Sequence, residues 1–90
     1  MPGDALLRCR VCGALTEEPP YGDDGRSPDF WFCPCCDVEH GYQDCQSSAA
    51  AVFRRGWLAR GGRWKRPSLD LEKLSLVVQL SRRPEGYRDD

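Results

Sequence analysis

The stretch FWFCPCCDVEHGY, residues 30–42, holds three cysteines within four consecutive positions. A second cysteine turn, CRVC, lies earlier in the chain at residues 9–12 and is followed by Gly13. Two C-x-x-C turns separated by 20 residues are a strong signature of a zinc site. The architecture therefore depends on which of these cysteines bind the same ion.

Spacing selects the second pair of ligands, because only Cys33 and Cys36 reproduce the separation between Cys9 and Cys12. Two intervening residues let the backbone turn so that both thiolates of a pair lie about 2.3 Å from one ion. Two such turns that face each other complete a tetrahedron. The sequence predicts one metal site made of Cys9, Cys12, Cys33 and Cys36. We expect Zn2+, with iron as the alternative, because sulfur ligands alone do not separate the two metals.

The residues beside the turns agree with this assignment. Pro34 follows the leading cysteine of the second turn, where its fixed φ suits the bend. Gly13 follows the first turn, where a positive φ is often needed, and Asp37 holds the equivalent place in the second. Aspartate is one of the few non-glycine residues that tolerate a positive φ.

Cys35 is left over by this ligand choice. We favour a small packed side chain over a redox thiol, because no basic residue or resolving cysteine is near it in the sequence. His40 and Cys45, even with Cys35 as a third ligand, lack the spacing of a second metal site. A closed four-cysteine site is structural, and the chain has one histidine, so we predict no catalytic residue and no enzymatic activity.

The size of the chain makes a metal a reasonable expectation. Ninety residues form one small domain, and a domain of this size gains little stability from burial alone. Six cysteines would suit three disulfides in a secreted protein. The first ten residues, however, lack the pattern of a secretory signal, and no apolar run reaches the length of a membrane span. We therefore expect a cytoplasmic protein with reduced cysteines.

The net charge of −1 conceals an asymmetry between the two halves of the chain. Residues 1–46 carry nine acidic side chains against three arginines, whereas residues 47–90 carry ten basic against five acidic side chains. The whole chain is too neutral for a generic nucleic-acid binder, but the second half alone is not.

The pattern predicts a small metal-bound α+β domain with three regions. Residues 1–46 read as turns and loops, with short antiparallel strands at residues 5–8 and 29–32 leading into the cysteine pairs. Residues 47–82 read as a region of one or two helices packed on this part. Residues 83–90 read as a loose tail.

The first helix is expected within residues 47–62. Ser47 or Ser48 is the predicted N-cap, and Gly61 with Gly62 is the predicted stop. Arg54 and Arg55 fall outside the apolar face, which at helical spacing is formed by Ala49, Val52, Phe53, Gly56 and Trp57.

A second helix is expected after Pro67. Ser68 is its predicted cap, and Leu71, Leu74 and Val78 repeat at helical spacing. Residues 76–80 also suit a strand, so helix is the first choice there and strand the second.

The segments CRVCG and EPPYGDDGRSPDFWFCPCCDVEHGY, at residues 9–13 and 18–42, resemble the bacterial cysteine-rich CPCC family of small, mostly uncharacterised proteins. The likeness extends over roughly residues 5–80 and departs at Asp37, where such proteins commonly have glycine, and at His40, where an aromatic residue is more usual. The resemblance implies a zinc-ribbon or rubredoxin-like pair of knuckles. It implies no particular biochemical activity.

Three functions compete on this basis. The first is a non-enzymatic zinc protein that binds a protein partner, through candidate residues Arg54, Arg55, Arg60, Arg63, Trp64, Lys65 and Arg66. For Trp57 and Trp64 we prefer a role in the core, since aromatic residues at helical spacing usually face it. The same basic surface could bind nucleic acid, but the acidic first half would repel phosphates.

The second function is rubredoxin-like electron transfer with iron in the same site. A disulfide oxidoreductase using Cys35 is the weakest of the three.

Overall fold

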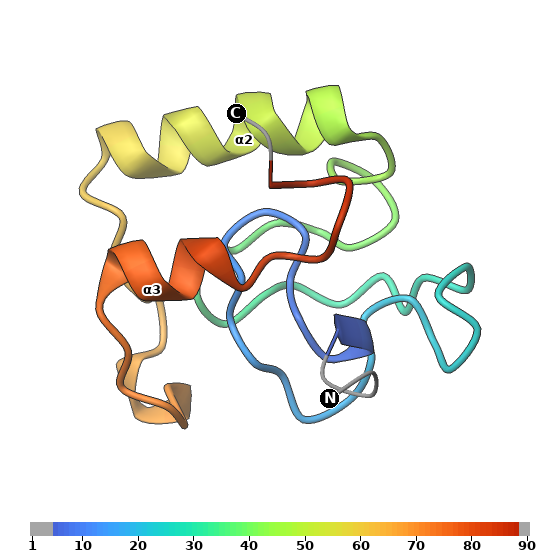
Figure 1. Ribbon diagram of the computed structural model, residues 1–90, viewed down its shortest axis with the longest axis horizontal. Helices are drawn as coiled ribbons and strands as arrows, with labels where there is room; N and C mark the ends of the chain where they lie inside the picture. Colours follow the sequence, from blue (N-terminus) through green and yellow to red (C-terminus); the bar gives the residue numbers. More distant parts are fainter. Residues whose placement is uncertain (1–4, 89–90) are drawn as a thin grey trace.

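The helices with defined bounds lie in the second half of the chain. The computed structural model describes residues 5–88. Its helices include α2 (Ser47–Ala59), the 3₁₀ turn η1 (Pro67–Leu69) and α3 (Leu76–Ser81). In Figure 1, α2 lies along one side of the molecule, α3 lies below it, and the loops of the N-terminal half fill the other side. None of the helices in the described part is long and apolar enough to cross a membrane.

The N-terminal half is organised by two turns, which we name knuckle 1 (residues 8–15) and knuckle 2 (residues 32–39). An isolated antiparallel bridge joins the first and last residue of each knuckle. Residues 5–88 contain these bridges but no strand, so the predicted strands at residues 5–8 and 29–32 are not confirmed. The physical reason is that the chain reverses too soon: residues 5 and 6 are helical, and Phe30 has a φ of 59° that interrupts extended backbone.

Helix α2 confirms the first predicted helix, with a different cap. Its N-cap is Gln46, whose side chain makes no capping hydrogen bond. Ser47 and Ser48 lie inside the first turn, so neither is the N-cap. The glycine stop is confirmed, since Gly61 and Gly62 have φ values of 115° and 60° and their amides donate to carbonyls of the last turn at 3.0 Å.

The buried face of α2 is rotated from the predicted one. Its buried residues are Ala50, Arg54 and Trp57, whereas Val52 is 62% exposed. The prediction that Arg54 points away from the core is wrong. A periodicity argument counts arginine as polar and places it on the solvent side of a helix. Here the Arg54 guanidinium instead donates hydrogen bonds to backbone carbonyl groups on the buried side.

Those carbonyls belong to knuckle 1 and to the C-terminal segment. The Arg54 Nε donates to the carbonyl oxygen of Val11 at 2.5 Å. Its Nη2 donates to the carbonyls of Arg10 at 3.0 Å and Tyr87 at 3.3 Å. Buried carbonyls need partners, and the knuckle has no neighbouring strand within residues 5–88 to supply them. Arg54 therefore attaches α2 to the first knuckle.

Helix α3 is shorter than predicted and begins later. The side chain of Ser75, not Ser68, caps it by accepting a hydrogen bond from the Val78 amide at 3.3 Å. Lys73 has a φ of 56°, which breaks any helix running from Ser68. Residues 76–80 are helical, which settles the choice between helix and strand in favour of helix.

Gly13 sets the distance between α3 and knuckle 1. Its φ is 81°, and a Cβ atom placed on it would lie 2.0 Å from the carbonyl oxygen of Gln79. A close approach of two backbones is one of the positions that glycine alone permits. The predicted turn glycine therefore also lets α3 dock.

The core is small and rich in sulfur. Five of its ten buried members are cysteines, and the others are Val11, Ala14, Val38, Ala50 and Trp57. Part of the predicted loose tail belongs to this packing, because Tyr87 lies against the core and Arg83 is 7% exposed. Residues 89 and 90 lie outside the described part. So few buried apolar side chains contribute little to the free energy of unfolding, so the fold needs another stabilising interaction.

Replacing Arg54 with alanine tests its attachment of α2 to knuckle 1. We expect Arg54→Ala to lower the free energy of unfolding by about 3 kcal/mol, because it leaves buried carbonyl groups without donors. Arg55→Ala is the matched control, since Arg55 is exposed on the same helix, and it should change stability by less than about 0.5 kcal/mol. Urea unfolding of the metal-loaded, reduced protein measures both. Equal losses in the two variants would contradict this role for Arg54.

Candidate metal centre

Four thiols meet where the two knuckles face each other. The Sγ atoms of Cys9, Cys12, Cys33 and Cys36 all lie within 4.8 Å of one another. The Sγ atoms of Cys9 and Cys36 are 3.7 Å apart, as are those of Cys12 and Cys33. Zinc–sulfur bonds of about 2.3 Å in a tetrahedron place sulfurs about 3.8 Å apart. The four cysteines singled out by spacing are thus positioned to bind a metal ion.

Backbone amides inside each knuckle point at its leading sulfur. The Val11 amide donates to the Cys9 Sγ at 3.4 Å, and the Cys35 amide donates to the Cys33 Sγ at 3.4 Å. Hydrogen bonds to the charged form favour it. These amides therefore stabilise thiolates, which are the form of cysteine that binds metals.

The two knuckles close in the same way. The Gly13 amide donates to the Cys9 carbonyl at 3.0 Å, and the Asp37 amide donates to the Cys33 carbonyl at 2.9 Å. Asp37 has a φ of 69°, close to the 81° of Gly13. The prediction that aspartate replaces glycine in the second turn is confirmed. Each residue of knuckle 2 is the equivalent of the residue 24 positions earlier.

The thiols are shielded from water, with none of the four more than 2% exposed. Burial raises the pKa of the Cys9, Cys12 and Cys36 thiols. Hydrogen bonds from the neighbouring thiols, that of Cys12 first, lower the pKa of Cys33. Four buried thiolates without a counter-charge would repel each other strongly, whereas a metal cation neutralises them. The chemistry of this donor set suits zinc or iron.

Cys35 is buried next to the centre but does not belong to the four. It is 1% exposed, and its thiol accepts a hydrogen bond from Gln79 Nε2 at 3.4 Å. Cys35 is the equivalent of Val11, which is also buried in knuckle 1. The burial of Cys35 therefore agrees with the prediction that it is a small packed side chain.

Gln79 is a residue that the sequence reasoning missed. It is 3% exposed in α3, and besides Cys35 its Nε2 donates to the Cys12 carbonyl at 3.2 Å. Its Oε1 accepts a hydrogen bond from the Trp64 Nε1 at 3.1 Å. One amide side chain thus links both knuckles to Trp64. A glutamine in an apolar stretch, QL after SLVV, was the available signal.

Arg8 forms a third contact between knuckle 1 and the C-terminal half of the chain. Its guanidinium forms a two-pronged ion pair with Glu72, with nitrogen–oxygen distances of 2.6 and 2.8 Å. It also donates to the Gly13 carbonyl at 3.2 Å. Two parallel hydrogen bonds of this kind are strong and directional. They fix the segment before α3 against knuckle 1.

His40 is part of a buried hydrogen-bond network and not of the metal centre. Its Nδ1 lies 3.0 Å from the Asp44 Oδ2, while Tyr21 OH and the Gly41 amide both donate to Asp44 Oδ1. Burial alone would raise the pKa of Asp44, but hydrogen bonds from His40, Tyr21 and Gly41 outweigh it and lower this pKa. Burial and the Asp44 carboxylate raise the pKa of Tyr21. This network holds the segment that follows knuckle 2.

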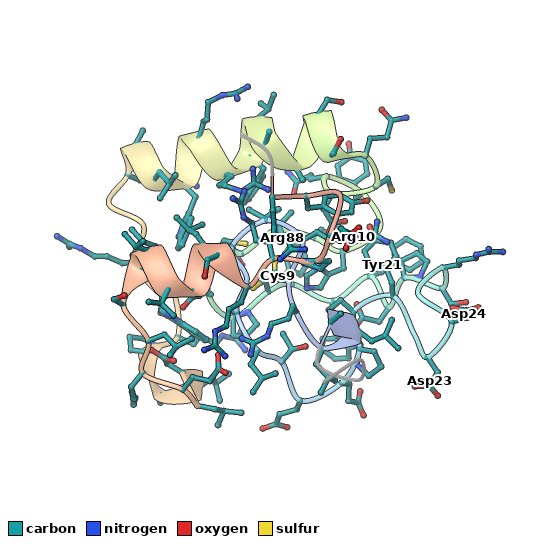
Figure 2. The ribbon with its side chains drawn as sticks, in the orientation of Figure 1. Cys9, Arg10, Tyr21, Asp23, Asp24 and Arg88 are labelled. Carbon is teal, nitrogen blue, oxygen red and sulfur yellow. The ribbon has the colours of Figure 1, made fainter. Side chains whose placement is uncertain are left out.

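Cys45 and the loop that carries Asp23 and Asp24 lie apart from the four thiols. Cys45 is exposed, and its thiol donates to the Gly41 carbonyl at 3.0 Å. Figure 2 shows Asp23 and Asp24 on a loop that projects away from Cys9. The cluster of potential ligands in the described residues therefore contains sulfur alone.

The residues proposed for partner binding divide into two groups. Arg54 is 3% exposed and holds knuckle 1, so its side chain is not on the surface. Trp64 packs against the core but is only partly buried, so its predicted contact with a partner stays a prediction. Trp57 is 4% exposed, which confirms its role in the core. The remaining cations are exposed, and they are Arg55, Arg60, Arg63, Lys65 and Arg66.

Comparisons with known proteins give one distant relative. The chain is similar to the uncharacterized protein YozI of Bacillus subtilis (strain 168), with 27% identity over 78 residues that cover 69% of this chain. The chain spans 64% of the length of that relative. No protein-family model matches the chain, and no solved structure matches it. The resemblance to the CPCC family thus stays a prediction, and the sequence and the thiol cluster support the description of a small cysteine-rich protein.

Serine substitutions separate the ligands from the other cysteines. We expect Cys9→Ser, Cys12→Ser, Cys33→Ser and Cys36→Ser to lose bound metal, because each removes a corner of the tetrahedron. Cys35→Ser and Cys45→Ser are the matched controls and should keep one metal ion per chain. Elemental analysis of the purified variants gives the result. Metal lost in Cys35→Ser but kept in Cys36→Ser would show that the ligand assignment is wrong.

Proposed function

We propose that this protein is a non-enzymatic zinc protein whose four-cysteine centre is structural and whose surface binds a protein partner. The observation that supports the structural role is the closed, buried geometry of the four thiols at sulfur–sulfur distances of 3.7 Å. Four protein ligands leave no coordination position for water or substrate, as in other structural zinc sites. The bound ion would neutralise the thiolates and join the knuckles, while Arg54, Gln79 and Arg8 hold the remaining chain on them.

A hollow lined by cations supports a role in binding. Arg60, Arg63 and Lys65 line a space of about 250 Å³ together with Asp37 and Trp57. The ion pair of Lys65 with Asp37, at 2.9 Å, takes up one of these charges. Two guanidinium groups remain, and guanidinium is well suited to carboxylate recognition. An acidic protein segment is the partner that this hollow favours.

Two other functions would use parts of the same structure. A rubredoxin-like iron carrier would use the same four sulfurs, which do not by themselves separate iron from zinc. A nucleic-acid-binding zinc ribbon would use the basic hollow, but the carboxylates of the first half weaken that reading. Membership of the CPCC family, and a location in the cytoplasm, belong to the same proposal.

Metal analysis tests the zinc centre directly. Protein purified under reducing conditions should be colourless and carry one zinc per chain, because zinc has a filled d shell and no visible charge-transfer transition. A red protein with one iron per chain would contradict the proposal in favour of electron transfer. Saturable binding of labelled DNA that weakens steeply with salt would contradict the choice of a protein partner.

A further inference from the structure

A second hollow, on residues that the proposed function does not use, is lined by aromatic and acidic side chains. Its volume is about 290 Å³. Trp31 and Phe32 contribute aromatic surface to it, and Leu69 and Leu71 contribute aliphatic surface from the segment around η1. We name this hollow the aromatic cleft. It brings together chain segments that are far apart in the sequence.

The apolar side chains of the aromatic cleft are unusually exposed. Trp31 is 73% exposed, Phe32 57% and Leu71 58%. Large apolar residues gathered on the surface of a small domain mark an interaction site more often than single exposed residues do. Tryptophan and phenylalanine are also enriched in protein interfaces, where tryptophan supplies much of the binding energy.

The backbone that presents these aromatic residues is fixed from both sides. The Asp29 amide donates to the Pro20 carbonyl at 2.9 Å, the Trp31 amide donates to the Asp29 Oδ1 at 2.9 Å, and the His40 amide donates to the Trp31 carbonyl at 3.0 Å. Between them, Phe30 adopts a φ of 59°, a conformation that bulky residues rarely take. Strained backbone of this kind gathers at functional sites. A rigid backbone lowers the entropic cost of binding at exposed side chains.

Charge selects the kind of ligand. Glu17, Glu18 and Asp29 line the aromatic cleft, and Arg66 is the one arginine or lysine among its described lining residues. Three carboxylates disfavour phosphate or an acidic peptide and favour arginine or lysine. The aromatic faces of Trp31 and Phe32 add a favourable surface for a cation.

We propose that the aromatic cleft binds a short basic peptide segment of another protein, with arginine or lysine set among apolar residues. The apolar side chains of the peptide would cover Trp31 and Leu71, and its arginine or lysine side chains would pair with Glu17 and Glu18. His40 also lines the cleft, with its Nδ1 already held by Asp44. The proposal rests on the proposed interaction role, but it involves neither the basic hollow nor the identity of the metal.

Selection from a random dodecapeptide display library on the reduced, metal-loaded chain tests the ligand class. We expect a consensus with at least two arginines or lysines beside leucine or aromatic residues. A fluorescein-labelled consensus peptide should bind with an affinity that falls as salt is raised. An acidic or uncharged consensus, or no consensus, would overturn the proposal.

Variants then locate the binding surface. Trp31→Ala and the double variant Glu17→Lys, Glu18→Lys should each weaken the peptide about tenfold or more. Tyr42→Ala is the matched control, because Tyr42 is also 73% exposed but does not line the cleft, and it should bind within about twofold of the wild type. Equal affinities for Trp31→Ala and Tyr42→Ala would overturn the proposal.

Two further measurements distinguish loss of peptide binding at the cleft from loss of the metal and from dimerisation of the chain. Each variant should retain the metal content of the wild type, so that loss of peptide binding reports on the cleft and not on the metal centre. Sedimentation of the wild-type chain without peptide should show a monomer. A dimer that Trp31→Ala converts to a monomer would mean that a second copy of the chain covers the cleft, and would overturn the proposal.

Discussion

The convergence of four thiolates is the constraint on which the rest of the molecule depends. The two knuckles meet through sulfur, and cysteines make up half of the buried core. Burial of Val11, Val38 and Trp57 contributes about 1.5 to 3 kcal/mol each, which is small beside the entropy of ordering a chain of this length. A structural zinc contributes on the order of 10 kcal/mol. Sulfur–metal bonding can thus do the work that a larger apolar core does elsewhere.

Single bridges rather than strands close the knuckles, so many backbone N–H and C=O groups of the knuckles need hydrogen-bond partners from elsewhere. Side chains from the C-terminal half perform that task here. Arg54 donates to the carbonyls of Arg10 and Val11, and Gln79 donates to the carbonyl of Cys12. The backbone amide of Lys65 adds a bond to the Cys35 carbonyl at 2.9 Å. The same contacts that complete the knuckles hold α2 and α3 in place, so the metal centre and the helices stabilise each other.

The features that the sequence predicts are those set by local geometry. The C-x-x-C spacing identifies the four clustered thiols, and Asp37 is recognisable as a substitute for glycine, because both depend on neighbouring residues. The inward side of α2 was mispredicted, since Arg54 makes its contact with a carbonyl 43 positions away. Gln79 and Arg8 reach partners 67 and 64 positions away. A single sequence can mark a residue such as Gln79 as unusual, but it does not show which distant residue is its partner. The two predicted strands are not confirmed, since each knuckle is closed by a single bridge.

Removal of the metal tests the central claim most directly. The reduced protein would be titrated with a strong chelator while near-ultraviolet circular dichroism and bound metal are measured together. Tertiary structure should disappear in proportion to the metal removed and return when one equivalent of zinc is added, because metal binding and folding are one process in such domains. A metal-free, reduced chain that keeps its full tertiary signal would contradict the account.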